Sequence, residues 1–145
     1  MRRMNRRPLL QAAPLSVLQP VGVAEAIRQA TSPAKVYELR IYQAVPGKLD
    51  SLVARFRDHT DKLFAKHGMT SLAYWTALDE PAKSSTFFYI LEHPSREAAA
   101  LNWKAFQDDP EWQAVKAKSE ENGKLVEKVD STYLTLTDFS KMPRT

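Results

Sequence analysis

The sequence predicts an α+β domain in which strands and helices follow one another in the order βαββαβ. Four segments have the alternating or β-branched composition of strands, two regions have the apolar spacing of helices, and turn residues separate them. A chain of 145 residues, 43% of them hydrophobic, is long enough for one domain with a single core. We therefore expect one four-stranded antiparallel sheet with the helices on one face.

The first half of this pattern is a strand, a helix and a hairpin. The first strand is expected over residues 36–44, and Pro46-Gly47 forms the turn that follows it. Apolar residues recur at helical spacing over residues 48–67, and Gly68 is a natural helix stop. Residues 70–77 and 86–92 are the next two strands, joined by a turn over the sequence LDEPAKSS, residues 78–85.

The second half begins with two helix starts. Ser95 is expected to be the N-cap of a helix that includes residues 98–106. Asp109 is expected to cap a further helix that begins at Pro110 and ends near residue 122. The last strand is expected over residues 126–136. This order of elements is the ferredoxin-like, or split βαβ, arrangement.

The excess of positive charge comes from the N-terminal extension. The net charge is +4, and residues 1–34 carry five arginines against one acidic residue, Glu25. Residues 35–145 carry 16 basic and 16 acidic residues, so the expected domain over residues 35–140 is close to neutral. A nucleic-acid partner needs a clustered excess of basic residues, and we therefore expect none. Residues 141–145 are expected to be a short tail.

The extension has the parts of an export signal. Arg6-Arg7 precedes a moderately apolar stretch, and a small-x-small site, residues 24–26, follows it. This pattern resembles a twin-arginine signal of bacterial export, which predicts a periplasmic or secreted protein. The alternative is a disordered basic tail on a cytoplasmic protein. The stretch is too short and too interrupted to span a membrane.

The first strand has two faces of different character. Tyr37, Leu39 and Ile41 are expected to face the core, and Glu38, Arg40 and Tyr42 share the opposite face. With helices on one side only, that opposite face of the sheet is left uncovered, and it is rich in aromatic residues. Such a patch usually marks an interaction surface. We therefore expect a two-fold homodimer in which two open sheet faces enclose a shared interior.

Several segments of the chain resemble the NIPSNAP domain. They are YELRIYQAVPGKLD near the start, LFAKHGM, YWT and DPEW in the middle, and STYLTLTDFS at the end. The resemblance covers residues 36–140 and keeps the order and spacing of the motifs. It implies the dimeric α+β barrel, a ferredoxin-like superfamily that includes antibiotic-biosynthesis monooxygenases, haem-degrading enzymes and small lyases. It implies little about activity.

The expected barrel interior supplies the candidate site. Glu38 and Arg40 lie two residues apart on one strand face, with about 7 Å between their Cα atoms. Arg40 is suited to clamp a carboxylate or phosphate, and Glu38 to orient it or to accept a proton. The alternative is an ion pair with a structural role. The candidate cavity residues share an expected position on the barrel interior, with aromatic walls: Glu38, Arg40, Tyr42, His59, Tyr74, Trp75 and Phe88.

The histidines are open to more than one interpretation. His59 is on or beside the apolar face of the first helix, where it can line the cavity or satisfy a buried polar contact. His67 is at the end of that helix, where a cation is favoured by the helix dipole. His93 precedes Pro94 and is interpreted as the end of a strand.

Two functions are compatible with these residues. The first is a homodimer that binds a small apolar or anionic molecule, or a partner, through the barrel interior. The second is a cofactor-free enzyme of the monooxygenase or lyase type, in which Glu38, Arg40, Tyr42 and His59 tune proton transfer. The chain has no cysteine, no glycine-rich phosphate loop and no nucleophile elbow, so we expect no metal and no cofactor. The sequence alone does not decide whether the protein is an enzyme.

Overall fold

The structure is a computed structural model, and it describes residues 34–141. The elements are β1 (Val36–Ala44), α2 (Leu49–Arg55), η1 (Phe56–Thr60), α3 (Asp61–Lys66), β2 (Thr70–Thr76), α4 (Ala82–Ser85), β3 (Thr86–His93), α5 (Arg96–Asp108), α6 (Pro110–Ser119) and β4 (Val126–Leu134). The predicted βαββαβ order is therefore confirmed. The export signal predicted in residues 1–34 lies outside the described residues, apart from residue 34.

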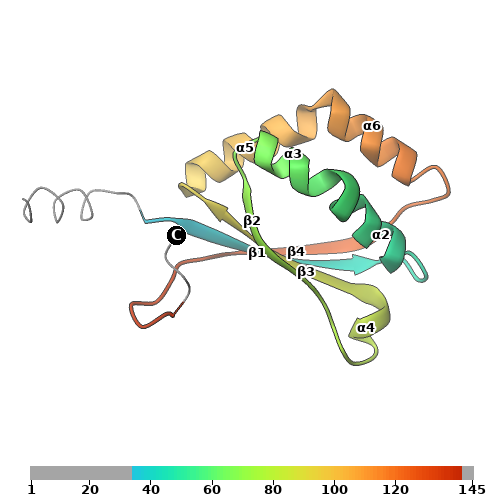
Figure 1. Ribbon diagram of the computed structural model, residues 1–145, viewed down its shortest axis with the longest axis horizontal. Helices are drawn as coiled ribbons and strands as arrows, with labels where there is room; N and C mark the ends of the chain where they lie inside the picture. Colours follow the sequence, from blue (N-terminus) through green and yellow to red (C-terminus); the bar gives the residue numbers. More distant parts are fainter. Residues whose placement is uncertain (1–33, 142–145) are drawn as a thin grey trace, which may run out of the picture. The chain divides into compact units, whose positions relative to one another are not determined.

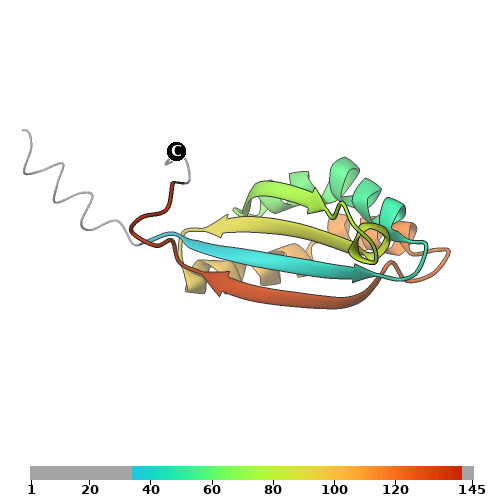
Figure 2. The same ribbon diagram turned by 90° about the horizontal axis from the view of Figure 1, so that it is seen from below.

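The four strands form one antiparallel sheet in the order β2-β3-β1-β4. The longer helices α2, α3, α5 and α6 lie on one side of this sheet, whereas the short α4 lies in the β2–β3 connection (Figure 1). Figure 2 shows the sheet from its other side, with these helices behind it. The predicted two-layer α+β fold is thus confirmed for one chain.

The helix predicted over residues 48–67 is one helical run with a wide turn in its middle. The wide turn is the π-helix η1, and the residues that join it to α2 and α3 keep right-handed helical backbone angles. The backbone N–H of Asp61 donates to the carbonyl of Phe56, five residues earlier, as in a π-helix, and the Thr60 hydroxyl donates to the carbonyl of Arg55 at 3.2 Å. Gly68 follows with a φ of 73°, the left-handed conformation that was expected of a helix stop.

The two faces of β1 are the reverse of the sequence-based assignment. Tyr42 packs edge-on against Phe56 of η1, with 5.7 Å between ring centroids. Glu38 accepts a hydrogen bond from Trp103 of α5. Glu38, Arg40 and Tyr42 therefore face the helices, and Tyr37, Leu39 and Ile41 face the open side. The prediction was wrong because it assumed that charged side chains lie away from the core. In the structure they lie in the core, where hydrogen-bond partners from distant elements compensate their burial.

Both predicted N-caps are confirmed. The Ser95 side chain accepts from the backbone N–H of Ala98 at 3.0 Å, at the start of α5. The Asp109 carboxylate accepts from the backbone N–H of Glu111 at 2.8 Å, at the start of α6. Asp109 also accepts from Lys66 and His67, which ties the end of α3 to the start of α6.

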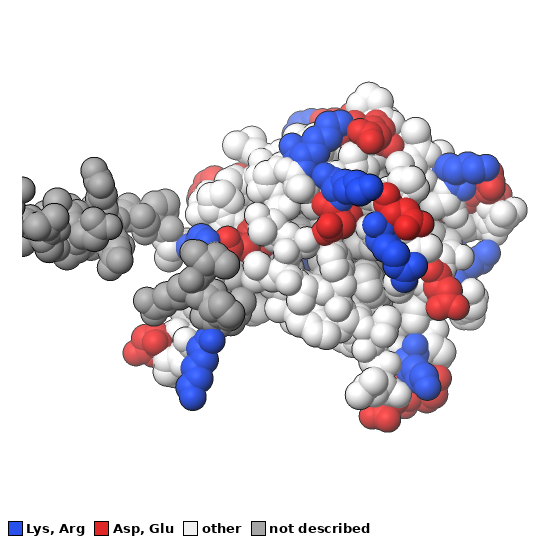
Figure 3. All heavy atoms as spheres, viewed as in Figure 1, with Lys and Arg blue, Asp and Glu red and all other residues white. Residues whose placement is uncertain are grey.

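The surface carries charges of both signs. Figure 3 shows lysine and arginine side chains beside acidic ones over the face that it presents, without a large region of one sign. Within residues 34–141 no helix is long and apolar enough to cross a membrane.

Candidate functional site

Glu38 is the centre of a polar network between the sheet and α5. Only 1% of this residue is exposed. Its Oε2 accepts from His93 Nε2 at 2.9 Å and from Trp103 Nε1 at 2.7 Å. Its Oε1 accepts from Arg40 Nη1 and from Ser131 Oγ, both at 2.7 Å. Because a carboxylate has about four acceptor positions, the four donors satisfy Glu38 fully.

These donors decide the charge of Glu38. Burial by itself raises the pKa of the carboxyl, but the hydrogen bonds from His93, Trp103, Ser131 and Arg40 outweigh burial and lower the pKa to about 2. Glu38 is therefore ionised at neutral pH and has no lone pair left for a substrate proton. This arrangement suits an anchor for its neighbours and does not suit a general base.

Arg40 is a partly exposed member of this network, since 17% of its side chain is exposed. Its guanidinium lies over the indole ring of Trp103, 4.2 Å from the ring centroid, in cation–π geometry. Nη1 pairs with Glu38, and Nη2 donates weakly to the Tyr42 hydroxyl at 3.4 Å. Its Nε is buried and has no hydrogen-bond partner among the described residues.

A pair of tyrosines carries the network across the sheet. The Tyr89 hydroxyl donates to the Tyr42 hydroxyl at 3.0 Å, and Tyr42 in turn accepts from Arg40. Burial raises the pKa of Tyr89 well above its ordinary value, so this phenol stays protonated. The ring centroids of Tyr89 and Tyr74 are 5.7 Å apart, so Tyr89 connects this network with a cluster of aromatic side chains between the sheet and the helices.

The aromatic end of the interior contains a pocket of about 320 Å³ between β2, β3 and the α2–η1–α3 helix. Its lining combines aromatic and aliphatic walls with two charged groups: Val53, Phe56, Arg57, Asp61, Tyr74 and Phe87. Tyr74 and Phe87 are stacked almost parallel, with 5.8 Å between centroids and 4° between ring planes. We call this cavity the aromatic pocket.

Asp61 fixes the polar side of the aromatic pocket. Its Oδ1 accepts from the Tyr74 hydroxyl at 2.7 Å and from the Ser71 hydroxyl. Burial, and then the hydrogen bond to Asp61, raise the pKa of Tyr74, so its hydroxyl remains a donor. Both bonds go to Oδ1, and the second carboxylate oxygen of Asp61 accepts no hydrogen bond from a side chain within residues 34–141.

The structure brings together only part of the predicted site. Glu38, Arg40 and Tyr42 form one network, and Tyr74 lies at the other end of the same interior. Trp75 and Phe88 are paired across β2 and β3 on the open side of the sheet, where the barrel interior was predicted. Glu38, Arg40, Tyr42 and Tyr74 lie instead between the sheet and the helices, so their predicted position in the barrel interior was wrong. His59 is exposed and lines a groove between the helices.

Sequence reasoning missed several partners of these residues. His93 was interpreted as a strand end, yet it is fully buried and donates to Glu38. It alternates in phase with Tyr89 and Leu91 along β3, which is the signal that could have identified an inward position. For Trp103 and Ser131, which are 65 and 93 residues from Glu38, the local sequence pattern contains no such signal.

Metal binding finds no support in the described part of the chain. Over residues 34–141, no group of three or more histidine, aspartate or glutamate side chains converges closely enough to hold a metal ion.

Comparison with known proteins identifies the relatives of the chain. The profile of the NIPSNAP family matches residues 37–141. None of the curated proteins that were compared with the chain is significantly similar in sequence.

Solved structures share the fold at low sequence identity. A NIPSNAP family protein from Agrobacterium tumefaciens is 21% identical, with a TM-score of 0.65 over 75% of this chain and 99% of that one. A second NIPSNAP family protein of that organism, described as having unknown function, is 16% identical, with a TM-score of 0.64 over 75% and 94%. An uncharacterized NIPSNAP-like domain protein from Burkholderia xenovorans is 17% identical, with a TM-score of 0.64 over 76% and 91%.

Proposed function

Because this chain belongs to the NIPSNAP family, whose fold it shares, we propose that it is a small-molecule-binding protein that works as a homodimer. The ligand that fits best is a small planar aromatic molecule with a hydroxyl group. The observation that carries this proposal is the aromatic pocket, in which stacked rings lie beside a carboxylate with a free oxygen. Pockets with apolar walls and a few convergent polar groups are typical ligand sites.

Each part of the aromatic pocket has a role in this proposal. Phe56, Tyr74 and Phe87 supply ring faces for a planar ligand, since aromatic pairs add to the free energy of apolar burial. The free oxygen of Asp61 accepts from the ligand hydroxyl. The Glu38 network is linked to Tyr89 through Arg40 and Tyr42, and it joins the sheet to α5.

The geometry gives no support to the alternative of a cofactor-free enzyme that uses Glu38, Arg40, Tyr42 and His59. Glu38 is held ionised and is saturated with donors. His59 lines a groove between two helices, whereas Arg40 and Tyr42 lie between the sheet and the helices. A proton relay through these four residues would need them at one centre.

The homodimer is supported by the character of the open sheet face. Across the strands, Ile41 is opposite Phe88, Leu39 is opposite Ile90, and Trp75 is opposite Phe88, so apolar side chains occupy its centre. Ion pairs lie toward its rim, Lys128 with Asp130 at 3.0 Å and Lys35 with Glu92 at 2.8 Å. An apolar centre with a charged rim is typical of protein interfaces.

The size of this face is sufficient for a second copy of the chain. Four strands spaced about 4.8 Å apart and about 30 Å long give a face of roughly 600 Å². A two-fold pairing of two such faces would bury about 1,200 Å² in total, which is at the lower end of specific interfaces. A face that pairs with itself needs no other partner, which makes the second copy the simplest occupant.

The ligand proposal is tested with 2-naphthol as the probe and with naphthalene as the same ring system without the hydroxyl. We expect saturable binding of 2-naphthol, and binding of naphthalene that is weaker by roughly tenfold because the hydrogen bond to Asp61 is lost. The measurement is a fluorescence titration of the full chain. Asp61→Asn should weaken 2-naphthol binding by a similar factor, since the charged acceptor is replaced by a neutral one.

The control is Tyr133→Phe, which removes the hydroxyl of a partly buried tyrosine that lies on β4, the edge strand opposite β2, and does not line the aromatic pocket. It should leave the affinity for 2-naphthol unchanged. The proposal is overturned if 2-naphthol shows no saturable binding, or if Asp61→Asn binds it as tightly as the unchanged protein does.

A further inference from the structure

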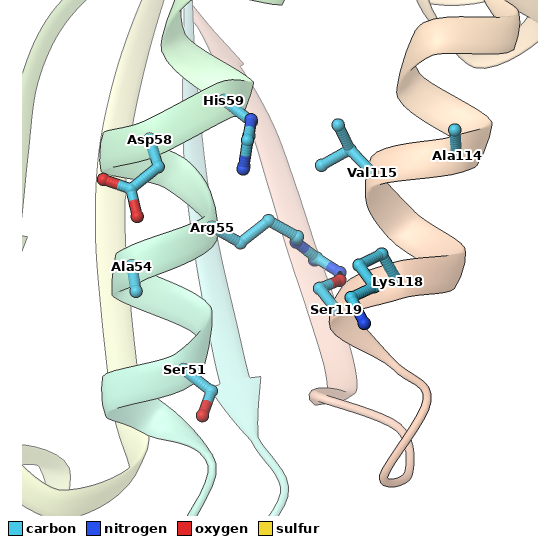
Figure 4. A pocket seen from close by; sticks show the side chains of 9 residues that line it. All are labelled: Ser51, Ala54, Arg55, Asp58, His59, Ala114, Val115, Lys118 and Ser119. Carbon is cyan, nitrogen blue, oxygen red and sulfur yellow. Dashed lines mark hydrogen bonds between the residues drawn. The ribbon is translucent and has the colours of Figure 1, made fainter.

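A second cavity lies between the α2–η1 helix and α6, away from the aromatic pocket. It has a volume of about 540 Å³. Figure 4 shows Arg55 and His59 directed from the first helical run toward α6, which supplies Val115 and Ser119 on the other side. We call this cavity the interhelical groove.

Arg55 is the unusual residue of this groove, because an arginine is rarely so deeply buried. Only 4% of its side chain is exposed. Its Nη1 donates to Ser119 Oγ at 3.2 Å and to Glu120 Oε1 at 3.3 Å. Its Nε is buried and has no hydrogen-bond partner within residues 34–141. The interactions with α6 therefore leave at least one donor of the guanidinium unused.

The unused Nε belongs to the edge of a guanidinium that binds carboxylates with two parallel hydrogen bonds. Both observed hydrogen bonds of Arg55 start from Nη1, so the pairing with Glu120 does not occupy Nε. The guanidinium is held over the Trp112 ring, 5.2 Å from its centroid. An anion that enters the groove thus meets a cation whose position is already fixed.

The other residues that line the groove indicate the chemistry of the rest of the ligand. Lys118 lines it and adds a positive charge, and His59 lines it with ring nitrogens that can form hydrogen bonds, whereas the carboxylate of Asp58 points away from α6 (Figure 4). Three small apolar side chains also line the groove: Ala54, Ala114 and Val115. A ligand that fits therefore carries one anionic group and a short aliphatic part.

We infer that the interhelical groove binds a small aliphatic carboxylate, with its carboxylate at Arg55 and its chain against the alanine and valine side chains. The π turn contributes to this geometry, because it lies in the same helical run directly after Arg55 and carries His59. Such wide turns are frequent at functional sites. The inference does not rest on the aromatic pocket, since different residues line the two cavities.

The test uses hexanoate, with 1-hexanol as the same chain without charge, in calorimetric titrations of the full chain. We expect saturable binding of hexanoate and binding of 1-hexanol that is weaker by roughly tenfold or more, since the charge-assisted bonds are lost. Arg55→Met should abolish hexanoate binding. Lys118→Ala should weaken hexanoate binding about fivefold, as the loss of one exposed charge.

Lys104→Ala is the matched control for Lys118→Ala. Both lysines are exposed, 75% and 78%, and each pairs with an acidic residue of its own helix region. Lys104→Ala and Asp61→Asn should leave hexanoate binding unchanged, which separates this site from the aromatic pocket. The inference is overturned if hexanoate does not saturate, if 1-hexanol binds equally well, or if Lys118→Ala has no effect. The Lys118 and 1-hexanol measurements decide the question even if Arg55→Met fails to fold.

Discussion

At the scale of single residues, Glu38 determines the organisation of the interior. It accepts from four side chains on three other elements and on its own strand. Removing a buried charge from such a network leaves its partners without an acceptor, and breaking a buried pair in this way typically costs more than forming it contributes. Glu38 is thus expected to be important for stability even though it is unsuited to proton transfer.

We predict that Glu38→Gln lowers the free energy of unfolding at pH 7 and changes its dependence on pH. Since the pKa of Glu38 is lowered from 4.5 to about 2 in the folded state, its ionisation contributes about 3 kcal/mol. A carboxyl with a lowered pKa contributes this stability fully above its unfolded pKa. The contribution is lost as the pH falls from about 4.5 to about 2. Urea unfolding of both proteins between pH 7 and pH 2 measures it.

The difference between the two proteins isolates Glu38 from other carboxyls. Hydrogen bonds from Lys66, His67 and the backbone of Glu111 also lower the pKa of Asp109, but Asp109 is the same in both proteins. The difference in unfolding free energy should therefore shrink toward low pH. A difference that stays constant from pH 7 to pH 2 would contradict the assignment. Asp108→Asn, which breaks an exposed ion pair with Lys104, should change stability by less than about 1 kcal/mol.

The composition of β1 explains why its faces could not be assigned from the sequence. Alternation separates Glu38, Arg40 and Tyr42 from Tyr37, Leu39 and Ile41, and that separation is correct. Which set faces the helices depends on partners such as His93, Trp103 and Ser131, which satisfy the buried charges. These partners are distant in the chain, and a single strand pattern contains no information about them.

At the scale of elements, the local signals were the most informative. Ser95 and Asp109 act within three residues of their own positions, so the sequence around each was enough to predict both caps. The π turn at Phe56–Thr60 was not predicted. Leu52, Phe56, Thr60 and Phe64 follow one another at intervals of four, which is the spacing of an ordinary α-helix as well.

We predict that Ser95→Ala lowers the free energy of unfolding by about 1 kcal/mol, because the first turn of α5 loses its side-chain acceptor. Ser95→Asn keeps an acceptor at this position and should change stability by only a few tenths of that amount. Chemical denaturation measures both variants. Equal stability of Ser95→Ala and the unchanged protein would contradict the capping role.

Asp109→Ala is expected to cost more than Ser95→Ala in the same measurement. Asp109 caps α6 and also accepts hydrogen bonds from Lys66 and His67. Its removal therefore deletes the hydrogen bonds between the end of α3 and the start of α6, in addition to the helix cap. The ranking of these two variants therefore distinguishes a cap that acts within one helix from one that joins two.

At the scale of the whole molecule, one face of the sheet is buried under helices, and the other has an apolar centre that no helix within residues 34–141 covers (Figure 2). A monomer of this kind would leave Leu39, Ile41 and Ile90 beside one another without a partner layer. Antiparallel sheets that face water normally alternate apolar and polar residues. The apolar centre is therefore better explained by a second protein layer than by solvent.

We predict that Ile90→Lys converts the proposed homodimer into a monomer. Ile90 lies opposite Leu39 and Ala73 near the middle of the open face, so a two-fold pairing would bury the new charge in an apolar interface. Light scattering at micromolar concentration should give twice the chain mass for the unchanged protein and one chain mass for the variant.

Leu101→Lys is the control. Leu101 is 70% exposed on α5, in the layer of helices, so this substitution should leave the dimer intact. Circular dichroism of the variant separates dissociation from unfolding, since a folded monomer keeps its strand and helix signals. A dimer that persists in a folded Ile90→Lys protein, or an unchanged protein that is monomeric, would show that this face does not bind a second copy.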